Sequence, residues 1–247
     1  MVSDKDTRTS RRTFLKGSAA IAAGAVVAPG IKLVETADAK NPDEAVTSAV
    51  RWGMLIDSEK CGDCTSCVTA CNEENGLVGH DRPKTDSQWI RKLNVKDNQT
   101  GHAFSLPVMC QHCETAACAD VCPTGASFKR EDGIVLVDKH ICIGCRYCMM
   151  ACPYKARSFV HEVLENQRSY APRGKGTVES CTLCVHRVDA GSDPACVDAC
   201  HREGNGAMVF GDLNDPESVV SQKLVKEGGK QIRADLGLNT GIRYQGI

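Results

Sequence analysis

The sequence has few aromatic residues for its length, with 2 Trp, 4 Tyr and 5 Phe among 247 residues. A chain of this size with so few aromatic side chains must hold its core together by other means, and a framework of bound cofactors is one of them. The chain also lacks an excess of either charge, with 30 basic and 31 acidic residues. Nothing in its net charge therefore suggests a nucleic-acid partner.

Motifs of several enzyme classes are missing as well. The sequence has no serine–histidine arrangement, no glycine loop that would cradle a phosphate and no open metal site with a general base. Beyond its N-terminal region it has no apolar run of roughly 20 residues, the length that a membrane-spanning helix needs. We therefore expect a non-catalytic mature chain that is associated with a membrane only through its partners.

The first 39 residues have the features of a removable export signal. Residues 10–16 read SRRTFLK, a twin-arginine motif, and an Ala- and Gly-rich run follows. Ala37 and Ala39 place small residues at the two positions that a signal peptidase reads, and Pro29 interrupts the run, which argues against an anchoring helix. The pattern predicts export by the twin-arginine pathway to the periplasm or the outer face of the cytoplasmic membrane.

Cysteine is abundant, and its sixteen residues fall into four groups of four. The groups are Cys61, Cys64, Cys67 and Cys71; Cys110, Cys113, Cys118 and Cys122; Cys142, Cys145, Cys148 and Cys152; and Cys181, Cys184, Cys196 and Cys200. Each group ends with two cysteines separated by three residues, and the second and third groups are followed directly by proline.

This spacing is typical of iron–sulfur ligands. Two intervening residues allow a tight loop whose thiolates point at neighbouring irons of one cluster, whereas three intervening residues span about one helical turn and aim the last sulfur elsewhere. In bacterial two-cluster ferredoxins the fourth cysteine of such a run binds the other cluster, and proline fixes the direction in which the chain leaves. A disulfide scaffold has no reason to repeat this spacing four times, and structural zinc prefers two separated Cys-x2-Cys pairs.

An internal repeat indicates a duplicated architecture. Residues 55–71 align without gaps on residues 136–152, with seven of seventeen positions identical, and the second and fourth groups share a looser Ala-Cys-x-Asp-x-Cys pattern. The chain is therefore expected to contain two ferredoxin-like modules, each with two clusters. The spacing alone does not decide which groups pair.

The segments between the groups predict an α+β fold with loop insertions. We expect strands at 52–57, 133–138 and 207–210, a hairpin formed by 88–95 and 102–108, and a charged connection at 161–180.

Domain boundaries are expected as follows: a signal peptide at 1–39, a linker at 40–51, a four-cluster domain at 52–213, and a C-terminal region at 214–247. In that last region we expect a helix at 217–226 capped by Asp215-Pro216, and an extended surface arm from Asp235.

The four groups, with eleven residues inside the last one, resemble the four-cluster [4Fe–4S] ferredoxin-type subunits of membrane-associated respiratory oxidoreductases. The resemblance covers roughly residues 52–213 and implies two interleaved modules, one from the first and fourth groups and one from the second and third. It also implies four ligand sets: Cys61, Cys64, Cys67 with Cys200; Cys181, Cys184, Cys196 with Cys71; Cys110, Cys113, Cys118 with Cys152; and Cys142, Cys145, Cys148 with Cys122.

Within that family, the leader and the segments CRYCMMACPYKARSF and GNGAMVFGDLNDPES resemble the periplasmic iron–sulfur subunit of the sulfite-reduction-associated Dsr membrane complex. The resemblance implies a quinone-interacting integral membrane subunit as partner and, in that complex, a periplasmic multihaem cytochrome. The expected function is electron transfer through four [4Fe–4S] clusters in dissimilatory sulfur metabolism. The alternatives are a subunit of a periplasmic molybdopterin or nitrite reductase and, in another class, a disulfide-rich exported binding domain.

The resemblance also places the cluster of Cys142, Cys145, Cys148 and Cys122 nearest the membrane subunit. Its neighbours are a mixture of cations and aromatics suited to a protein interface, namely Arg146, Tyr147, Tyr154, Lys155 and Arg157. Three histidines beside ligands are expected to face solvent, namely His112, His186 and His201.

Replacing both Arg11 and Arg12 with Lys is expected to trap the precursor in the cytoplasm, because a receptor reads the arginine pair itself. Cell fractionation followed by immunoblotting would measure this. Normal periplasmic delivery of the double variant would show that the chain uses another route.

Overall fold

The structure is a computed structural model, and it describes residues 45–165 and 167–247. The expected signal peptide at 1–39 and the first residues of the expected linker lie outside the described residues. Among the residues described, no helix has the length and apolar character to cross a membrane.

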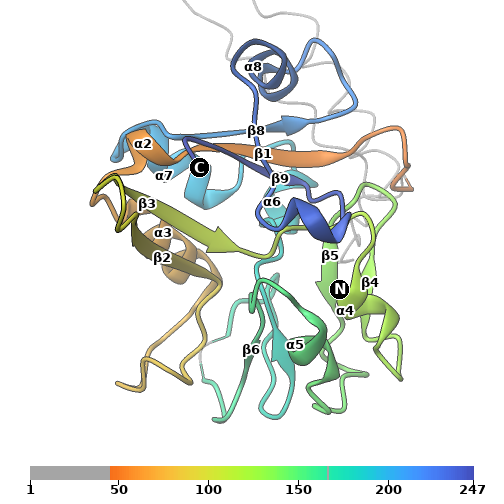
Figure 1. The fold of residues 1–247 in the computed structure, drawn as a ribbon. Helices are drawn as coiled ribbons and strands as arrows, with labels where there is room; N and C mark the ends of the chain where they lie inside the picture. Colours follow the sequence, from red (N-terminus) through yellow and green to blue (C-terminus); the bar gives the residue numbers. More distant parts are fainter. Residues whose placement is uncertain (1–44, 166) are drawn as a thin grey trace, which may run out of the picture. The chain divides into compact units, whose positions relative to one another are not determined.

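A three-stranded sheet lies at the centre of the described chain (Figure 1). Its middle strand is β1 (Trp52–Asp57), which pairs antiparallel with β8 (Met208–Asp212) and parallel with β9 (Ile242–Gln245). Met54 and Ile56 in β1 are fully buried, as expected of an apolar strand covered on its inner face. The strand expected at 52–57 is confirmed at those bounds, and the strand expected at 207–210 occupies Met208–Asp212.

The C-terminal strand corrects one expectation: the chain beyond Asp235 is not a surface arm. A short 3₁₀ turn, η1 (Ala234–Leu236), leads into β9, where Ile242 and Tyr244 are fully buried against the rest of the sheet. These two buried side chains alternate with Arg243 and Gln245, as expected of a strand. An alternation over only four residues is too short to predict that strand from the sequence.

Helix α8 (Val219–Glu227) forms close to the expected position, but its N-cap is different. The Ser218 side chain accepts a hydrogen bond from the Ser221 amide, so Ser218 caps the helix rather than Asp215-Pro216. Asp215 and Ser218 are both suitable N-cap residues and lie within one helical turn of each other. The helix uses Ser218, which is the nearer of the two to its first residue.

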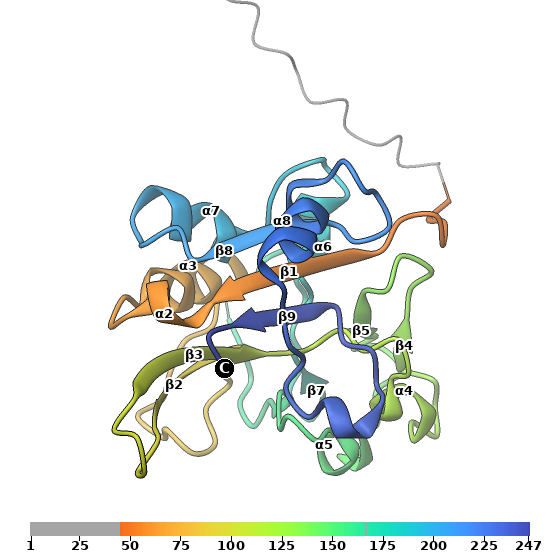
Figure 2. The same cartoon turned by 45° about the horizontal axis from the view of Figure 1, so that its top comes forward.

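The other helices are short, and each lies in or beside a cysteine group. They are α2 (Ser58–Cys61), α3 (Ser66–Asn75), α4 (Ala117–Asp120), α5 (Tyr147–Ala151), α6 (Val185–Val188) and α7 (Ala195–Arg202). Helix α3 packs against α7, and α4 packs against α5. Figure 2 shows α3 and α7 together beside one end of the central sheet, while α4 and α5 lie together elsewhere in the domain.

The described residues also form three two-stranded antiparallel sheets: β2 (Ile90–Lys96) with β3 (Ala103–Met109), β4 (Ser127–Lys129) with β5 (Val135–Val137), and β6 (Ser158–Phe159) with β7 (Val178–Glu179). The hairpin expected from residues 88–95 and 102–108 is confirmed with a shift of one or two residues, and the strand expected at 133–138 is shorter. The resulting fold mixes helices and strands, as the expected α+β class requires.

A buried ion pair fixes the connection that precedes the fourth cysteine group. Arg173 donates from Nε and Nη2 to the two carboxylate oxygens of Glu179, each at 2.8 Å, and from Nη1 to the Gly76 carbonyl at 2.7 Å. Both side chains are buried, so the charges lose their hydration. The bidentate hydrogen bonds offset the free-energy cost of this desolvation. The charged segment is therefore held against α3.

Tyr244 joins β9 to the loop of the second cysteine group. Its hydroxyl accepts a hydrogen bond from Gln111 Nε2 at 3.0 Å and donates one to the Pro107 carbonyl at 3.1 Å, inside a site with no exposure. The Gly241 carbonyl, just before β9, accepts from the Met54 amide, and the Gly241 amide donates to the Gln111 carbonyl. The C-terminal strand thus ties β1 to a cysteine loop far away in sequence.

Replacing Tyr244 with Phe is expected to destabilise the protein by about 1–3 kcal/mol, because it leaves buried partners without their hydrogen bonds. The apparent melting temperature under anaerobic conditions would measure this, with the exposed Tyr147→Phe as the matched control. Equal melting temperatures for the two variants would contradict the proposed role of β9.

Candidate iron–sulfur sites

Each Cys-x2-Cys pair that opens a cysteine group contains a residue with a positive φ. These residues are Gly62, His112, Gly144 and Leu183, with φ between 44° and 70°. A residue with positive φ turns the chain sharply, so that two cysteines three positions apart can face the same site. His112 and Leu183 carry side chains in this conformation, which costs of order 1–3 kcal/mol each and is typical of functional loops.

Gly144 is required for a second reason. A Cβ atom at this position would lie 2.2 Å from the Gly176 carbonyl oxygen, so no other residue fits without moving the backbone. The loop of the third cysteine group is therefore packed directly against the turn before β7.

Three cavities are each lined by four cysteines from two different groups. The first is lined by Cys110, Cys113, Cys118 and Cys152, the second by Cys122, Cys142, Cys145 and Cys148, and the third by Cys71, Cys181, Cys184 and Cys196. We call them the Cys110, Cys142 and Cys181 cavities. In each, one group supplies three thiols and another group supplies the trailing cysteine.

The other four cysteines also lie close together. The thiols of Cys61 and Cys67 interact electrostatically with that of Cys200, and with Cys64. A Cβ atom at Gly204 would be 2.9 Å from the Cys200 carbonyl oxygen and 3.2 Å from Cys64 Sγ, so both residues lie close to Gly204. The Lys92 ammonium donates to the carbonyl oxygens of Cys61 and Cys64. We call this the Cys61 site.

Backbone amides donate to several of the sulfur atoms. The amide of Ala207 donates to Cys200 at 3.2 Å, that of Ser127 to Cys122 at 3.4 Å, and that of Leu183 to Cys181 at 3.4 Å. The Val178 amide does the same for Cys142 at 3.5 Å. Such donors favour a thiolate over a thiol and set the reduction potential of a bound cluster.

Burial raises the pKa of the inner thiols. It raises the pKa of Cys67 to about 11 and those of Cys110 and Cys113 to about 12, and it raises the pKa of Cys181 and Cys196 well above the ordinary value. Neighbouring thiols raise these pKa values further. Thiolates at these positions therefore need a cationic centre, such as the irons of a cluster, to compensate their charge.

Unpartnered polar atoms at the cavities test whether a cluster fits. Among the described residues, seven buried side-chain nitrogen or oxygen atoms have no hydrogen-bond partner, and six of them belong to residues that line the cavities. These are Gln111, Tyr154 and Arg157 at the Cys110 cavity, Ser127 at the Cys142 cavity, and Asn75 and Trp89 at the Cys181 cavity. Four of these six atoms can donate a hydrogen bond, namely Trp89 Nε1, Arg157 Nη1 and the hydroxyls of Tyr154 and Ser127. The sulfides of an iron–sulfur cluster can accept it. The lining therefore fits that cofactor.

All sixteen cysteines are free thiols, with no disulfide among them. Within residues 45–165 and 167–247, no three Cys, His, Asp or Glu side chains come close enough to bind a single metal ion. The cysteines surround cavities instead, as ligands of a multi-iron cluster do.

The structure corrects several expectations about neighbouring residues. His112 is buried rather than solvent-facing: its Nδ1 accepts a hydrogen bond from the Val135 amide at 3.0 Å, and burial followed by the charge of Arg157 lowers its pKa to about 3. Tyr154 and Arg157, expected at an interface, are only 7% and 6% exposed. Nothing in the local spacing distinguishes them from the exposed Lys155 between them.

The other two histidines differ from one another. His201 is exposed, as expected. His186 does not face solvent as expected, because it is half-buried: its ring stacks on Tyr170, with centroids 4.1 Å apart, and its Nε2 lies 2.8 Å from a carboxylate oxygen of Glu74. It links α6 to α3.

Known proteins resemble this chain over nearly its whole length. Residues 102–213 match the family model of a 4Fe-4S dicluster domain, and residues 8–28 match that of a twin-arginine translocation signal sequence. The chain is 41% identical to Hdr-like menaquinol oxidoreductase iron-sulfur subunit 1 of Archaeoglobus fulgidus, over 95% of this chain and 97% of the relative.

Two further relatives are similar over comparable lengths. A tetrathionate reductase subunit of Salmonella typhimurium is 35% identical, over 97% of this chain and 89% of the relative. Protein NrfC of Escherichia coli is 34% identical, over 92% of this chain and 91% of the relative.

The signal sequence directs the chain across the membrane, and the sixteen cysteines fit four [4Fe–4S] clusters. On the strength of these relatives, the chain belongs to the family of ferredoxin-type iron–sulfur subunits that transfer electrons within oxidoreductase complexes and are not the catalytic subunits of those complexes.

Proposed function

We propose that this protein relays electrons between a quinone-interacting membrane subunit and a second redox partner, through four clusters with defined ligands. The ligand sets are those of the three cysteine cavities and the Cys61 site: Cys110, Cys113, Cys118, Cys152; Cys142, Cys145, Cys148, Cys122; Cys181, Cys184, Cys196, Cys71; and Cys61, Cys64, Cys67, Cys200. Each cluster supplies one-electron transfer.

The observation that carries this proposal is the exchange of trailing cysteines at the cavities. The third group lines the Cys142 cavity with three cysteines and the Cys110 cavity with its last one, Cys152; the second group does the reverse through Cys122. Since Cys148 and Cys152 are one helical turn apart, the two sites lie close together. Short separations of this kind are what electron transfer between clusters requires.

The packing of the helices supports two interleaved modules. Helices α3 and α7, from the first and fourth groups, pack together, and so do α4 and α5, from the second and third groups. We propose that these pairs belong to two modules within a four-cluster domain at 52–213. The signal peptide at 1–39 and the linker at 40–51 remain proposals from the sequence.

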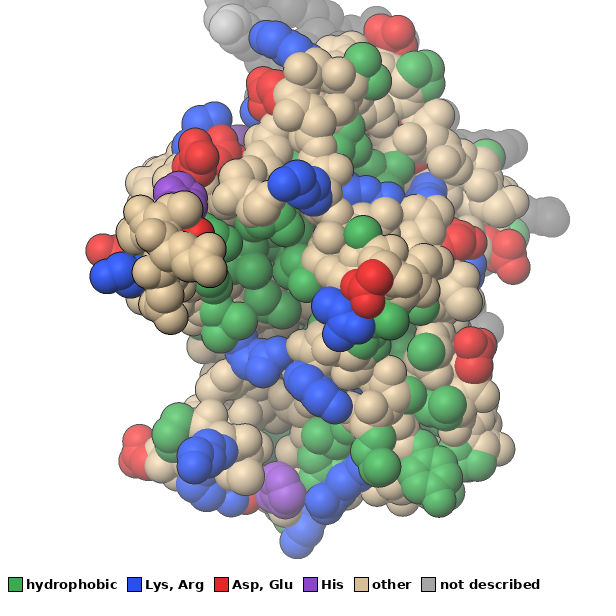
Figure 3. Space-filling view, in the orientation of Figure 1, with side chains coloured by type: hydrophobic (Ala, Val, Ile, Leu, Met, Phe, Trp, Pro, Cys, Tyr) green, Lys and Arg blue, Asp and Glu red, His purple; other side chains and the backbone are tan. Residues whose placement is uncertain are grey.

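An exposed apolar patch beside the Cys142 cavity supports a docking site there. The patch, which we call the α5 patch, consists of Ile141, Ile143, Tyr147 and Met150, all exposed, and Cys145 is itself exposed. Figure 3 shows hydrophobic side chains gathered around α5, with Lys and Arg side chains beside them. Exposed apolar side chains around a surface-lying redox site suit a protein interface.

We propose that the α5 patch docks the membrane subunit. The Archaeoglobus fulgidus relative is named as a subunit of a menaquinol oxidoreductase, which supports a quinone-interacting partner. Arg146 and Lys155 are exposed near the patch and are the cations that we expect to assist docking; Arg146 also stacks over the Phe159 ring at 3.8 Å. Tyr154 and Arg157 are excluded from this role by their burial.

The identity of the complex is a finer proposal. We propose a complex of the sulfite-reduction-associated Dsr type in dissimilatory sulfur metabolism, with a periplasmic multihaem cytochrome as a second partner. The similarity to a component of tetrathionate reductase supports a molybdopterin reductase as the alternative. The free thiols and the iron–sulfur relatives both argue against a disulfide-rich binding domain.

Serine substitutions can test the ligand sets directly. Cys118→Ser and Cys152→Ser are expected to alter the spectrum and potential of the same cluster, although the two residues belong to different groups. Cys148→Ser should alter another cluster. Electron paramagnetic resonance of the reduced proteins would show which cluster each variant alters. Chemical analysis of the wild-type protein should find about sixteen irons and as many sulfides. If Cys152→Ser changed the same cluster as Cys148→Ser, the exchange of trailing cysteines would be wrong.

Replacing Met150 with Asp is expected to weaken assembly with the membrane subunit while leaving iron content unchanged. Met150 is 74% exposed, so the change places a charge in the proposed interface without disturbing the core. Co-purification from solubilised membranes would measure assembly. The matched control is Val225→Asp on α8, where the side chain is 90% exposed. Equal co-purification of both variants would refute the α5 patch as the docking site.

A further inference from the structure

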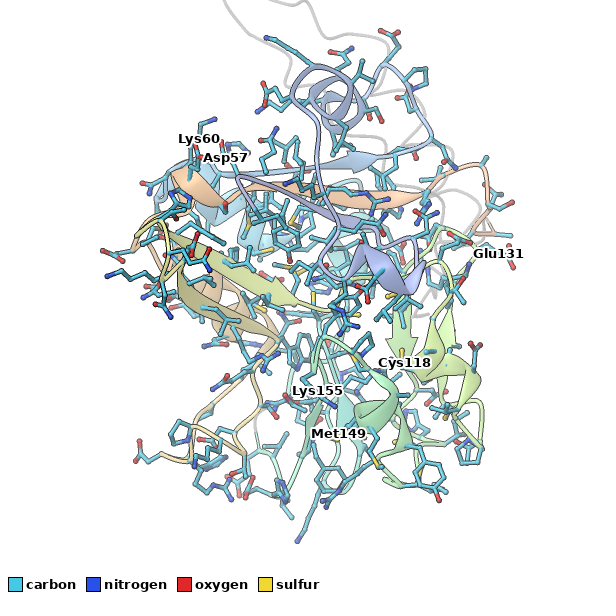
Figure 4. All side chains as sticks on the ribbon, in the orientation of Figure 1. Asp57, Lys60, Cys118, Glu131, Met149 and Lys155 are labelled. Carbon is cyan, nitrogen blue, oxygen red and sulfur yellow. The ribbon has the colours of Figure 1, made fainter. Side chains whose placement is uncertain are left out.

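Arg157 is a buried cation whose guanidinium contacts a proposed cluster ligand. Only 6% of the residue is exposed, and its Nη2 lies 2.9 Å from Cys118 Sγ. The side chain lines the Cys110 cavity together with Tyr154. Figure 4 shows Cys118 beside the β4–β5 hairpin, with Lys155 and Met149 nearby around α5.

The charge of Arg157 acts on two cavities. It interacts with Cys110 and Cys118 of the Cys110 cavity and also with Cys148 of the Cys142 cavity. One guanidinium is therefore within electrostatic reach of ligands proposed for two clusters.

Cysteine sulfurs are the groups that compensate this buried charge. Within the described part of the chain, Arg157 forms no ion pair with a carboxylate, whereas the equally buried Arg173 is held by both oxygens of Glu179. An arginine stays protonated under all ordinary conditions, and a buried cation without an anion is costly. The group that the guanidinium contacts directly is the sulfur of Cys118, at 2.9 Å from Nη2.

The guanidinium also has a free donor. Arg157 Nη1 is buried without a hydrogen-bond partner, and so is the Tyr154 hydroxyl at the same cavity. Because Nη2 already contacts Cys118, the planar guanidinium holds Nη1 in a fixed direction nearby. Two donors are thus available to a cluster at this site in addition to the contact with its ligand.

We propose that Arg157 raises the reduction potentials of the clusters in the Cys110 and Cys142 cavities, with the larger effect in the Cys110 cavity. One-electron reduction adds a negative charge to a cluster, and a fixed cation stabilises the reduced form more than the oxidised form. In a buried, weakly polar environment this preference is much larger than at a surface. The inference rests on the ligand sets proposed above.

The test is a redox titration followed by electron paramagnetic resonance on the full chain, comparing wild type with Arg157→Gln. In the variant, two of the four clusters should become harder to reduce. The more affected one should change its reduced-to-oxidised ratio at least tenfold at a fixed potential, which is about 59 mV for a one-electron couple. The other two clusters should keep their wild-type potentials.

The matched control is Lys226→Gln, which removes an exposed cation on α8, an element that lines none of the three cysteine cavities. Since solvent screens this charge, all four potentials should stay close to those of wild type. Unchanged potentials in Arg157→Gln, an equal shift of all four clusters, or an equal effect of Lys226→Gln would each overturn the proposal.

Arg157→Met tests the proposal if the Gln variant does not retain sixteen irons, because methionine removes the charge without leaving an unpaired polar group in the cavity. The same two clusters should become harder to reduce, and wild-type potentials in Arg157→Met would overturn the proposal. Arg157→Lys keeps the charge but cannot reproduce the planar fork, so its shifts should be smaller than those of the charge-free variant, and equal shifts would overturn the role of the charge. If two clusters shift but are not those altered by Cys118→Ser and Cys148→Ser, the role of Arg157 stands and the ligand sets are wrong.

Discussion

Closure of each cysteine cavity by a thiol from another cysteine group is the constraint on which the rest of the fold depends. Cys71 meets cysteines more than a hundred residues away at the Cys181 cavity, and the short helices α3 and α7 pack together next to it. None of the helices that hold cysteines exceeds ten residues, too few to be stable alone. Cluster binding therefore contributes folding free energy, which suits a chain with few aromatic residues.

The same constraint explains why polar side chains are tolerated deep in the protein. Trp89 Nε1, the Tyr154 hydroxyl and Arg157 Nη1 would each be a costly unsatisfied donor in an ordinary core. Around a cluster they face sulfur atoms and negative charge, so the same atoms favour cofactor binding and influence the reduction potential. Stability and redox tuning are thus properties of one set of contacts.

The sequence predicts this arrangement where local spacing determines it and fails where tertiary contacts do. Cys-x2-Cys loops and a trailing cysteine one helical turn later follow from local geometry, and the strand at 52–57 follows from its apolar run. Strand β9 is missed because four alternating residues carry too weak a pattern, and its burial depends on pairing with β1. The burial of Arg157 and His112 depends on elements that are distant in sequence, and a local motif contains no signal for it.

The differing exposure of the sites suggests how the protein separates conduction from docking. Cys181 and Cys196 are buried, so a cluster in the Cys181 cavity would be shielded from water, whereas Cys145 is exposed beside the α5 patch, which is our proposed docking site. Arg146 and Arg157 both lie beside proposed cluster ligands, but Arg146 is exposed and Arg157 is buried. Solvent screens the charge of Arg146, which leaves it available for docking, whereas the charge of Arg157 keeps most of its effect on the neighbouring clusters. Burial is therefore the property that separates the two roles that we propose for these arginines.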